Sequence, residues 1–274
     1  MTRWLDSFRD ALAQTESELD AARADRESRR LDVHVIGIVV VASVMLTLQE
    51  YYGSSSDYTT LTWPLGLVMG EADAEAWVKE VFRAGEYARL HRLFYWVAIT
   101  SATYVLGPAL YIRLVMRQRV VDFGFGVKGI FKHAWIYLGM YAVVLPCLFL
   151  VGQADSFQRT YPFYGNAGRS AYDFFAWETA YAIQFLSLEF FFRGFLVHGL
   201  KSRFGFYAIL VSVMPYCMIH FGKPMPETLG AILAGIALGA LSLFTRSIWL
   251  GVAIHVSVAV SMDLISLWLQ GKLL

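Results

Sequence analysis

A carboxylate and a guanidinium lie inside an apolar run, Gln184 to Phe195, that reads QFLSLEFFFRGF. Glu189 and Arg193 are four residues apart, so on a helix they share one face and can form an ion pair. Ionisable residues within a membrane span are rare, face the interior of the helix bundle and usually mark a functional site. The alternative is a structural ion pair that joins two helices. These two residues alone do not separate the two interpretations.

Two histidines in later apolar segments could join Glu189. Counting about 1.5 Å of rise per residue from the basic end of each span puts Glu189, His220 and His255 roughly 18, 25 and 13 Å into the membrane. Because helix tilt can close differences of this size, we expect the three side chains to converge near mid-membrane. A carboxylate with two imidazoles could activate water or bind a metal. Each histidine taken alone can equally make a hydrogen bond between helices.

Other ionisable residues are weaker candidates. Glu227 follows two prolines at a helix start, where a carboxylate suits the helix dipole, so it can also be a cap with Lys223 as its neighbour. Asp263 lies two turns beyond His255 and can share its face, although about 12 Å of rise separates them. We expect Glu178 to be solvated near a membrane surface.

The composition indicates the class of protein. The 274 residues are 57% hydrophobic and 16% charged, with a mean hydropathy of +0.49. Long continuous apolar runs predict membrane-spanning helices, because hydrocarbon cannot hydrogen-bond an open backbone and a barrel would need period-2 alternation. We therefore predict an all-α, multi-pass membrane helical bundle. The net charge of +1 gives no indication of a nucleic-acid partner.

The apolar segments predict seven spans, at about residues 33–52, 93–115, 134–151, 172–200, 204–220, 227–244 and 248–269. Gly230, Gly235 and Gly239 in the sixth should permit close helix approach. Residues 1–32 mix apolar side chains with many charges, which predicts an N-terminal amphipathic segment ahead of a membrane domain at 33–274.

Basic residues flank alternate ends of the spans, and this bias predicts a cytoplasmic N-terminus with residues 53–89 and 152–169 outside. In the first of these outer segments, Trp77, Val78, Val81 and Phe82 alternate with charges and predict an amphipathic helix at the membrane interface. We expect an integral protein of the bacterial inner (cytoplasmic) membrane.

The order of the motifs adds a resemblance. The Glu189-Phe-Phe-Phe-Arg-Gly run, Tyr216 four residues before His220, and His255 after a Ser-Ile-Trp helix start resemble the CPBP family of intramembrane proteases. These proteins are also called type II CAAX prenyl proteases or Abi proteins, and the sequence is also similar to their myxosortase-type branch. The resemblance covers about residues 120–265, including Asp122-Phe-Gly.

Two positions depart from the pattern that the family implies. The first motif of the family is Glu-Glu-x-x-x-Arg, and its first glutamate, usually regarded as the base that activates water, is Leu188 here. The asparagine four residues after the last histidine is Ala259. These two changes leave open whether the chain is active.

The resemblance implies hydrolysis of a peptide bond by water, near the C-terminal region of a lipidated or membrane-anchored protein. On the residues present, Glu189 would be the general base, paired with Arg193, His220 would position the water, and His255 would donate to the developing oxyanion. Tyr216, Glu227 and Asp263 are secondary candidates. The implied partners are the protein substrate and the lipid bilayer, with no cofactor.

Three alternatives stay open at this point. A metal could be held by one glutamate and two histidines, a known zinc ligand set, although no His-Glu-x-x-His spacing exists and we favour a metal-free site. An inactive family member could serve as a membrane binding or immunity protein, with Glu189 and Arg193 as a structural pair. A transporter would need a polar pathway, for which the first three spans offer almost no polar residues.

Overall fold

The computed structural model describes residues 6, 9–10, 13–21, 32–128 and 130–273. The named helices are α2 (Val33–Tyr52), α3 (Thr62–Met69), α4 (Glu71–Lys79), α5 (Ala88–Ser101), α6 (Gly107–Leu110), α7 (Ala134–Gly152), α8 (Asp155–Thr160), α9 (Ala171–Glu189), α10 (Gly199–Phe204), α11 (Ala208–Met218), α12 (Met225–Thr245) and α13 (Trp249–Leu269). Shorter 3₁₀ or π-helical segments are η1 (Asp57–Leu61), η2 (Glu80–Ala84), η3 (Ala102–Leu106), η4 (Tyr111–Val115), η5 (Val120–Asp122), η6 (Ile130–His133), η7 (Phe190–His198) and η8 (Gly205–Tyr207).

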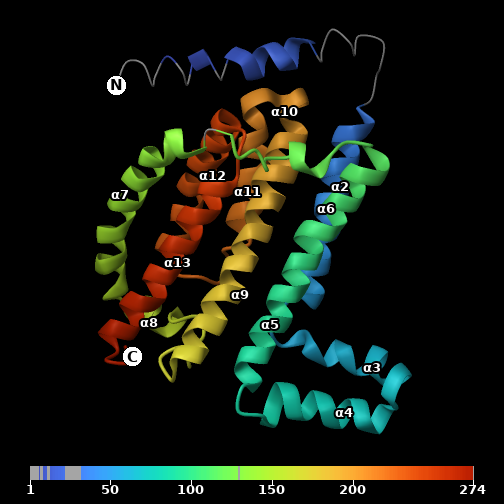
Figure 1. The fold of residues 1–274 in the computed structure, drawn as a ribbon, viewed down its shortest axis with the longest axis vertical. Coiled ribbons are helices and arrows are strands. Elements are labelled where there is room, and N and C mark those ends of the chain that lie inside the picture. Colours follow the sequence, from blue (N-terminus) through green and yellow to red (C-terminus); the bar gives the residue numbers. More distant parts are fainter. Residues whose placement is uncertain (1–5, 7–8, 11–12, 22–31, 129, 274) are drawn as a thin grey trace.

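The long helices run side by side, as Figure 1 shows. Helix α10 lies at one end of this bundle, here called the α10 end, and α3, α4 and α8 lie at the other, here called the α8 end. Among the described residues, six helical stretches are long and apolar enough to cross a membrane. The protein is therefore an integral, multi-pass membrane protein with an all-α fold, as predicted.

The predicted count of seven spans is not confirmed. The predicted fourth and fifth spans both fall within one helical stretch, Ala171–Met218. The chain turns at Gly205, whose φ of +55° favours glycine, and α11 returns to pack against η7. Helix α11 has 11 residues, so it rises about 16 Å, roughly half of the hydrocarbon thickness.

Small residues bring α11 and α12 together. A Cβ atom added at Gly235 would lie 3.0 Å from Cγ2 of Val213, and one added at Gly239 would lie 2.7 Å from Cγ2 of Ile209. The predicted close approach is confirmed at these two glycines. It is wrong at Gly230, which has no atom within 4 Å of such a Cβ because it faces away from α11.

At the α10 end, the loop that contains Asp122-Phe-Gly contacts both η7 and the start of α13. The backbone N–H of Ile248 donates to the carbonyl oxygen of Gly124 at 2.8 Å, just before α13 begins. In η7, a Cβ at Gly194 would lie 2.7 Å from the carbonyl oxygen of Phe123. The Asp122-Phe-Gly segment is thus wedged between η7 and the start of α13, and it fixes their spacing.

The predicted N-terminal segment, 1–32, lies partly outside the described residues. Residues 13–21 are helical and lie across the α10 end (Figure 1). There Glu18 pairs with Arg246 at 2.5 Å and with Lys201 at 3.5 Å. The described part of this segment therefore contacts the membrane domain through charges.

The segment between α2 and α5 differs in detail from its prediction. Helices α3 and α4 run across the direction of the spans (Figure 1). Of the residues predicted to lie at the interface, Val78 and Phe82 are buried against Tyr58 and Tyr95. Trp77 on α4 is 43% exposed, as the prediction requires, and further exposed apolar side chains lie on α3, where no residue is buried. Helix α3 is the segment whose surface suits a membrane interface.

Candidate functional site

The ion pair between Glu189 and Arg193 lies at the junction where the α-helix α9 continues as a π-helical segment. Glu189 is the last residue of α9, and Arg193 lies in the π-helical segment η7. π-helical turns are uncommon and occur frequently at functional sites. Such turns leave carbonyl groups in need of other donors, and the hydroxyl of Ser212 on α11 donates to the carbonyl oxygen of Phe192 at 2.9 Å.

Glu189, Arg193 and His255 form a single cluster. Nη1 of Arg193 lies 3.2 Å from Oε1 of Glu189, and Nδ1 of His255 lies 2.7 Å from the same oxygen. The side chains of Glu189 and Arg193 are 1% and 2% exposed, whereas that of His255 is 14% exposed. The predicted pair thus exists, and the predicted convergence of Glu189 with His255 is found in the structure.

Tyr216 extends this cluster toward α11. Its hydroxyl lies 2.8 Å from Nε2 of His255, and the guanidinium of Arg193 stacks over its ring at 4.2 Å from the centroid. With Nδ1 facing a carboxylate, the neutral imidazole carries its proton there, so Nε2 accepts from the hydroxyl of Tyr216. A chain of contacts therefore runs from Glu189 through His255 to Tyr216.

His220 belongs to the edge of this cluster. Its Nδ1 donates to the backbone carbonyl oxygen of Tyr216 at 2.8 Å, and the two rings meet edge to face at 4.8 Å. This bond leaves Nε2 of His220 as an acceptor. The structure therefore brings His220 beside Tyr216 rather than into direct contact with Glu189.

The buried ion pair does not satisfy all of its own polar atoms. Within the described protein, Oε2 of Glu189 and both Nη1 and Nη2 of Arg193 have no hydrogen-bond partner of good geometry. Buried polar groups in stable proteins are almost always hydrogen-bonded, and exceptions often belong to catalytic sites. Oε2 of Glu189 can therefore still accept a hydrogen bond, and the guanidinium of Arg193 can still donate one, next to His255.

Two contacts around the cluster were missed by sequence reasoning. A Cβ at Gly251 would lie 2.7 Å from Oε2 of Glu189, so α13 approaches the carboxylate at a residue without a side chain. The ring of Phe185 stacks on that of His255 with centroids 5.2 Å apart. Both residues could have been found from spacing, because Gly251 lies four residues before His255 and Phe185 four before Glu189.

The two family positions that differ in this chain lie in apolar surroundings. Leu188 is 3% exposed and belongs to the apolar core around η7. Ala259 packs with Trp177 and Tyr181. Neither position supplies a polar group to the cluster.

The predicted site residue Glu227 lies in a separate cluster. The hydroxyl of Tyr161 donates to both carboxylate oxygens of Glu227 at 2.8 Å, and Nζ of Lys223 lies 3.0 Å from Oε1 of Glu227. Burial raises the pKa of Tyr161 well above its usual value of 10, so this hydroxyl stays protonated. The contact between Glu227 and Lys223 follows the sequence prediction, and among the described residues no hydrogen bond or ion pair joins Glu227 to Glu189.

Asp263 also lies outside the cluster of Glu189. Its two oxygens accept hydrogen bonds at 3.0 Å, one from the backbone N–H of Phe163 and one from Nε1 of Trp177. Glu178 lies close enough for its charge to interact with that of Asp263, and it is only 8% exposed. The expectation that Glu178 is solvated is wrong, because the loop that carries Phe163 covers this end of α9.

The possible zinc ligands of the cluster, Glu189 and His255, bond to each other, and His255 also bonds to Tyr216. Both ring nitrogens of His255 are engaged, one by Glu189 and one by Tyr216. No group of three metal-ligating side chains is found in the part of the chain that the structure describes. In the cluster, the carboxylate of Glu189 contacts one guanidinium and one imidazole.

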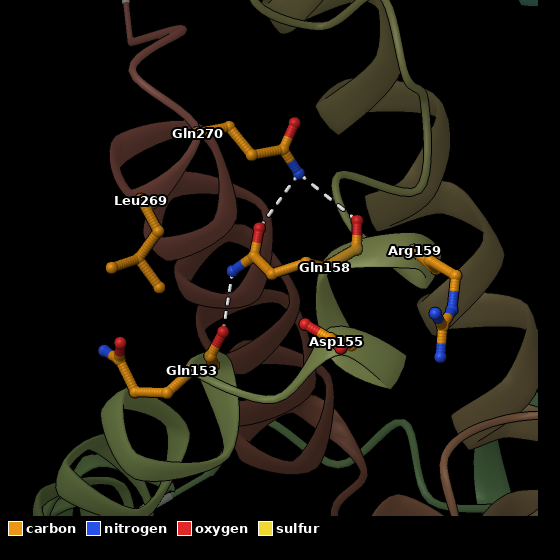
Figure 2. Close-up of a pocket in the computed structure, with 7 residues that line it drawn as sticks. Gln153, Asp155, Gln158, Arg159, Leu269 and Gln270 are labelled. Atoms are coloured by element: carbon orange, nitrogen blue, oxygen red, sulfur yellow. Dashed lines mark hydrogen bonds between the residues drawn. The ribbon is translucent and has the colours of Figure 1, made fainter.

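A polar cleft of about 460 Å³ opens elsewhere, at the α8 end (Figure 2). The side chain of Gln270 donates to Gln158, and Gln158 donates to the carbonyl oxygen of Gly152 at 2.6 Å. These bonds tie α7, α8 and α13 together, and none of the residues of the Glu189 cluster lines this cleft.

Comparison with known proteins agrees with the arrangement of these residues. The fold and the buried polar cluster define a multi-pass membrane protein with a candidate hydrolytic site. The model of the Rce1-like family, described as type II CAAX prenyl endopeptidase Rce1-like, matches residues 171–261. Residues 171–261, about a third of the chain, are therefore similar to this CAAX protease family, also called CPBP. No curated protein and no solved structure matches the chain.

The matched segment contains the cluster but not all of the sequence candidates. Glu189, Arg193, Tyr216, His220 and His255 all lie within residues 171–261, whereas Asp263 lies just beyond them. The family is one of membrane proteases.

Proposed function

We propose that this protein is an intramembrane endopeptidase that hydrolyses a peptide bond near the C-terminal region of a lipidated or membrane-anchored protein. The observation that carries the proposal is the buried cluster of Glu189, Arg193 and His255, which lies within the family-matched segment and has donors and an acceptor without partners. A purely structural ion pair is stable only when further hydrogen bonds satisfy its remaining atoms.

In this proposal Glu189 and His255 act as one acid–base unit. Glu189 accepts the Nδ1 proton of His255, which leaves Nε2 as the basic atom. A water proton moves to Nε2, the hydroxide attacks the peptide carbonyl carbon, and the imidazolium then returns the proton to the leaving amine. The sequence alone made Glu189 the base, but in this proposal His255 takes that role because its side chain is the more exposed of the two.

The negative charge that develops on the carbonyl oxygen of the substrate must be stabilised by hydrogen-bond donors close to His255. When water displaces the hydroxyl of Tyr216 from Nε2 of His255, that hydroxyl becomes free to donate to the oxyanion. Arg193 stacks on the same ring, and its Nη2 has no hydrogen-bond partner among the described residues, so Arg193 adds positive potential there. His220 retains an acceptor at Nε2 and can help orient the water.

The substrate class follows from where the site lies. Glu189 and Arg193 are buried within a stretch that spans the membrane, so only a peptide held at or in the bilayer reaches them. An anchor confines a substrate to that plane, which favours a lipidated or membrane-anchored tail over a soluble protein. The myxosortase-type branch and the inner-membrane location stay predictions.

The test uses the full-length protein in liposomes with two fluorogenic peptides of the same sequence, one farnesylated and one without the lipid. We expect the wild type to cleave the farnesylated peptide faster. Glu189→Gln and His255→Ala should each reduce the rate by about 10²-fold or more, because they remove the base or its partner. His198→Ala is the matched control, since His198 is a buried histidine bonded to Ser242 outside the cluster.

One observation favours the alternative of an inactive family member that binds membrane proteins. Leu188 occupies the position of the glutamate usually regarded as the base, and it is buried among apolar residues. If abundant wild-type protein releases no more product than protein-free liposomes from a panel of farnesylated and transmembrane-anchored peptides, that alternative replaces the protease proposal.

We also infer the orientation from the basic residues near the α10 end, which place that end in the cytoplasm. Asn166 lies in the loop between α8 and α9, at the opposite end. A cysteine introduced at Asn166 should react with an impermeant maleimide on intact cells. Reaction only after permeabilisation would reverse the orientation.

A further inference from the structure

Two arginines line a cleft at the α8 end, away from the Glu189 cluster. The cleft has a volume of about 310 Å³ and lies between the loop that follows α2, the first turns of α5 and the loop after α8. Its polar lining includes Arg89, Arg92, Ser55 and Ser56, and Phe163 supplies part of its apolar wall.

Neither arginine of the cleft has an ionic partner. Among the described residues, Arg89 and Arg92 make no ion pair or hydrogen bond, whereas Arg169 nearby pairs with Asp173 at 2.8 Å. The acidic groups of the same region are engaged elsewhere. Glu86 lies 3.4 Å from Arg169, and Asp57 accepts from the backbone N–H of Ser54 at 2.9 Å. Among the described residues, no carboxylate therefore forms a direct ion pair with either arginine of the cleft.

The helix to which the arginines belong adds to this positive potential. Arg89 is the second residue of α5, and no acidic residue lies in the first turn of that helix. The N-terminus of a helix carries partial positive charge and normally favours carboxylates, so cations in this place are unfavourable unless an anion joins them. The two arginines and the positive end of α5 therefore lie in the same region.

The guanidinium of Arg89 lies close to the loop on the opposite side of the cleft. A Cβ atom added at Gly165 would lie 2.6 Å from Nη1 of Arg89, so the guanidinium lies directly over the backbone of that glycine. The absence of a side chain at Gly165 is what gives the guanidinium its place.

We propose that this cleft binds a phosphate group, supplied by an anionic phospholipid of the leaflet at the α8 end. Guanidinium groups bind phosphate oxygens in bidentate fashion, and the hydroxyls of Ser55 and Ser56 add neutral donors. The cleft lies at the end of the span Ala88–Val115, where lipid headgroups begin. Helix α3, with Trp63 and Val68 75% and 84% exposed, presents apolar side chains to the acyl region beside it.

The test uses the full-length protein in maltoside micelles, titrated separately with dihexanoyl-phosphatidylglycerol, dihexanoyl-phosphatidylcholine and inorganic phosphate. The readout is the shift of the thermal unfolding midpoint, followed by tryptophan fluorescence and fitted to an apparent Kd. We expect saturable stabilisation by phosphatidylglycerol that exceeds that by phosphatidylcholine. The double variant Arg89→Gln/Arg92→Gln should bind at least tenfold more weakly.

Lys79→Gln is the matched control, because Lys79 is an exposed cation on α4 outside the cleft. If the double variant does not accumulate, Arg92→Gln and Gly165→Ala replace it, and each should weaken binding. Stabilisation by inorganic phosphate without phosphatidylglycerol would assign the cleft to a free phosphate instead of a lipid. Equal binding of both lipids, or equal binding by wild type and the arginine variants, would overturn the proposal.

Discussion

Helices α9 and α13 carry two buried polar clusters, and the two clusters stabilise their carboxyl groups in different ways. At the α9–η7 junction, Glu189 is balanced by a guanidinium and an imidazole. Toward the α8 end, Asp263 is held by one backbone and one indole N–H group. Fixed N–H donors stabilise a carboxylate without exchanging protons, whereas an imidazole can exchange one.

The difference teaches which buried acid is suited to chemistry. Asp263 has both oxygens occupied and connects the loop at Phe163 to α9 and α13, which is a structural task. Among the described residues, Glu189 has one oxygen without a hydrogen-bond partner, and its other oxygen contacts His255, whose side chain is 14% exposed. Both carboxyl groups are buried, so burial does not distinguish them. The chemical nature of their hydrogen-bond partners does.

The largest expected effect comes from breaking the ion pair of the inner cluster. Arg193→Leu should lower the free energy of unfolding by about 3–5 kcal/mol, because it leaves Glu189 buried without its cation. The double variant Glu189→Leu/Arg193→Leu should recover most of that loss. Thermal unfolding in detergent micelles measures both. If Arg193→Leu were as stable as the wild type, the charges of Glu189 and Arg193 would not be coupled.

A smaller effect is expected from moving Glu189 without changing it. Gly251→Ala places a Cβ 2.7 Å from Oε2 of Glu189, so the carboxylate must shift. A displacement of this kind can cost about 10²-fold in rate. The measurement is cleavage of the farnesylated peptide. Gly139→Ala on α7 is the control, since a Cβ there meets no atom within 4 Å, and equal losses in both would refute the positional argument.

Removing one hydroxyl from the chain of contacts should have a still smaller effect. Tyr216→Phe deletes the group bonded to Nε2 of His255 and keeps the ring over which Arg193 stacks. We expect kcat to fall by about tenfold, as for loss of one hydrogen bond of about 1.4 kcal/mol. Tyr104→Phe, in the same apolar core, should leave kcat unchanged. An unchanged kcat in Tyr216→Phe would remove its hydroxyl from the mechanism.

The smallest effect is expected in the outer cluster, and it sharpens the contrast with Glu189. Both oxygens of Glu178 lack a hydrogen-bond partner in the described protein, and the residue lies beside Asp263. Glu178→Gln removes an acid from an unfavourable place, so stability should change by less than about 1 kcal/mol. Peptide cleavage should be unaffected. A loss of activity comparable to that of Glu189→Gln would mean that both clusters take part in the reaction.

Several features of the candidate site follow from sequence because they are local. The interval of four residues predicts that Glu189 and Arg193 share a helix face, and the apolar run around them predicts that both are buried. The separation of basic residues and apolar runs likewise predicts the class of fold. Each of these inferences depends only on the period of a helix and on the cost of burying charge.

Other features depend on contacts between helices, which no period in the sequence specifies. The pairing of Nδ1 of His255 with Glu189 requires α13 to approach α9 closely at Gly251. The half-length of α11 depends on the turn at Gly205, and the burial of Glu178 depends on a loop that folds over it from elsewhere in the chain. Sequence determined which side chains are costly to bury, and tertiary packing decided which partners stabilise each of them.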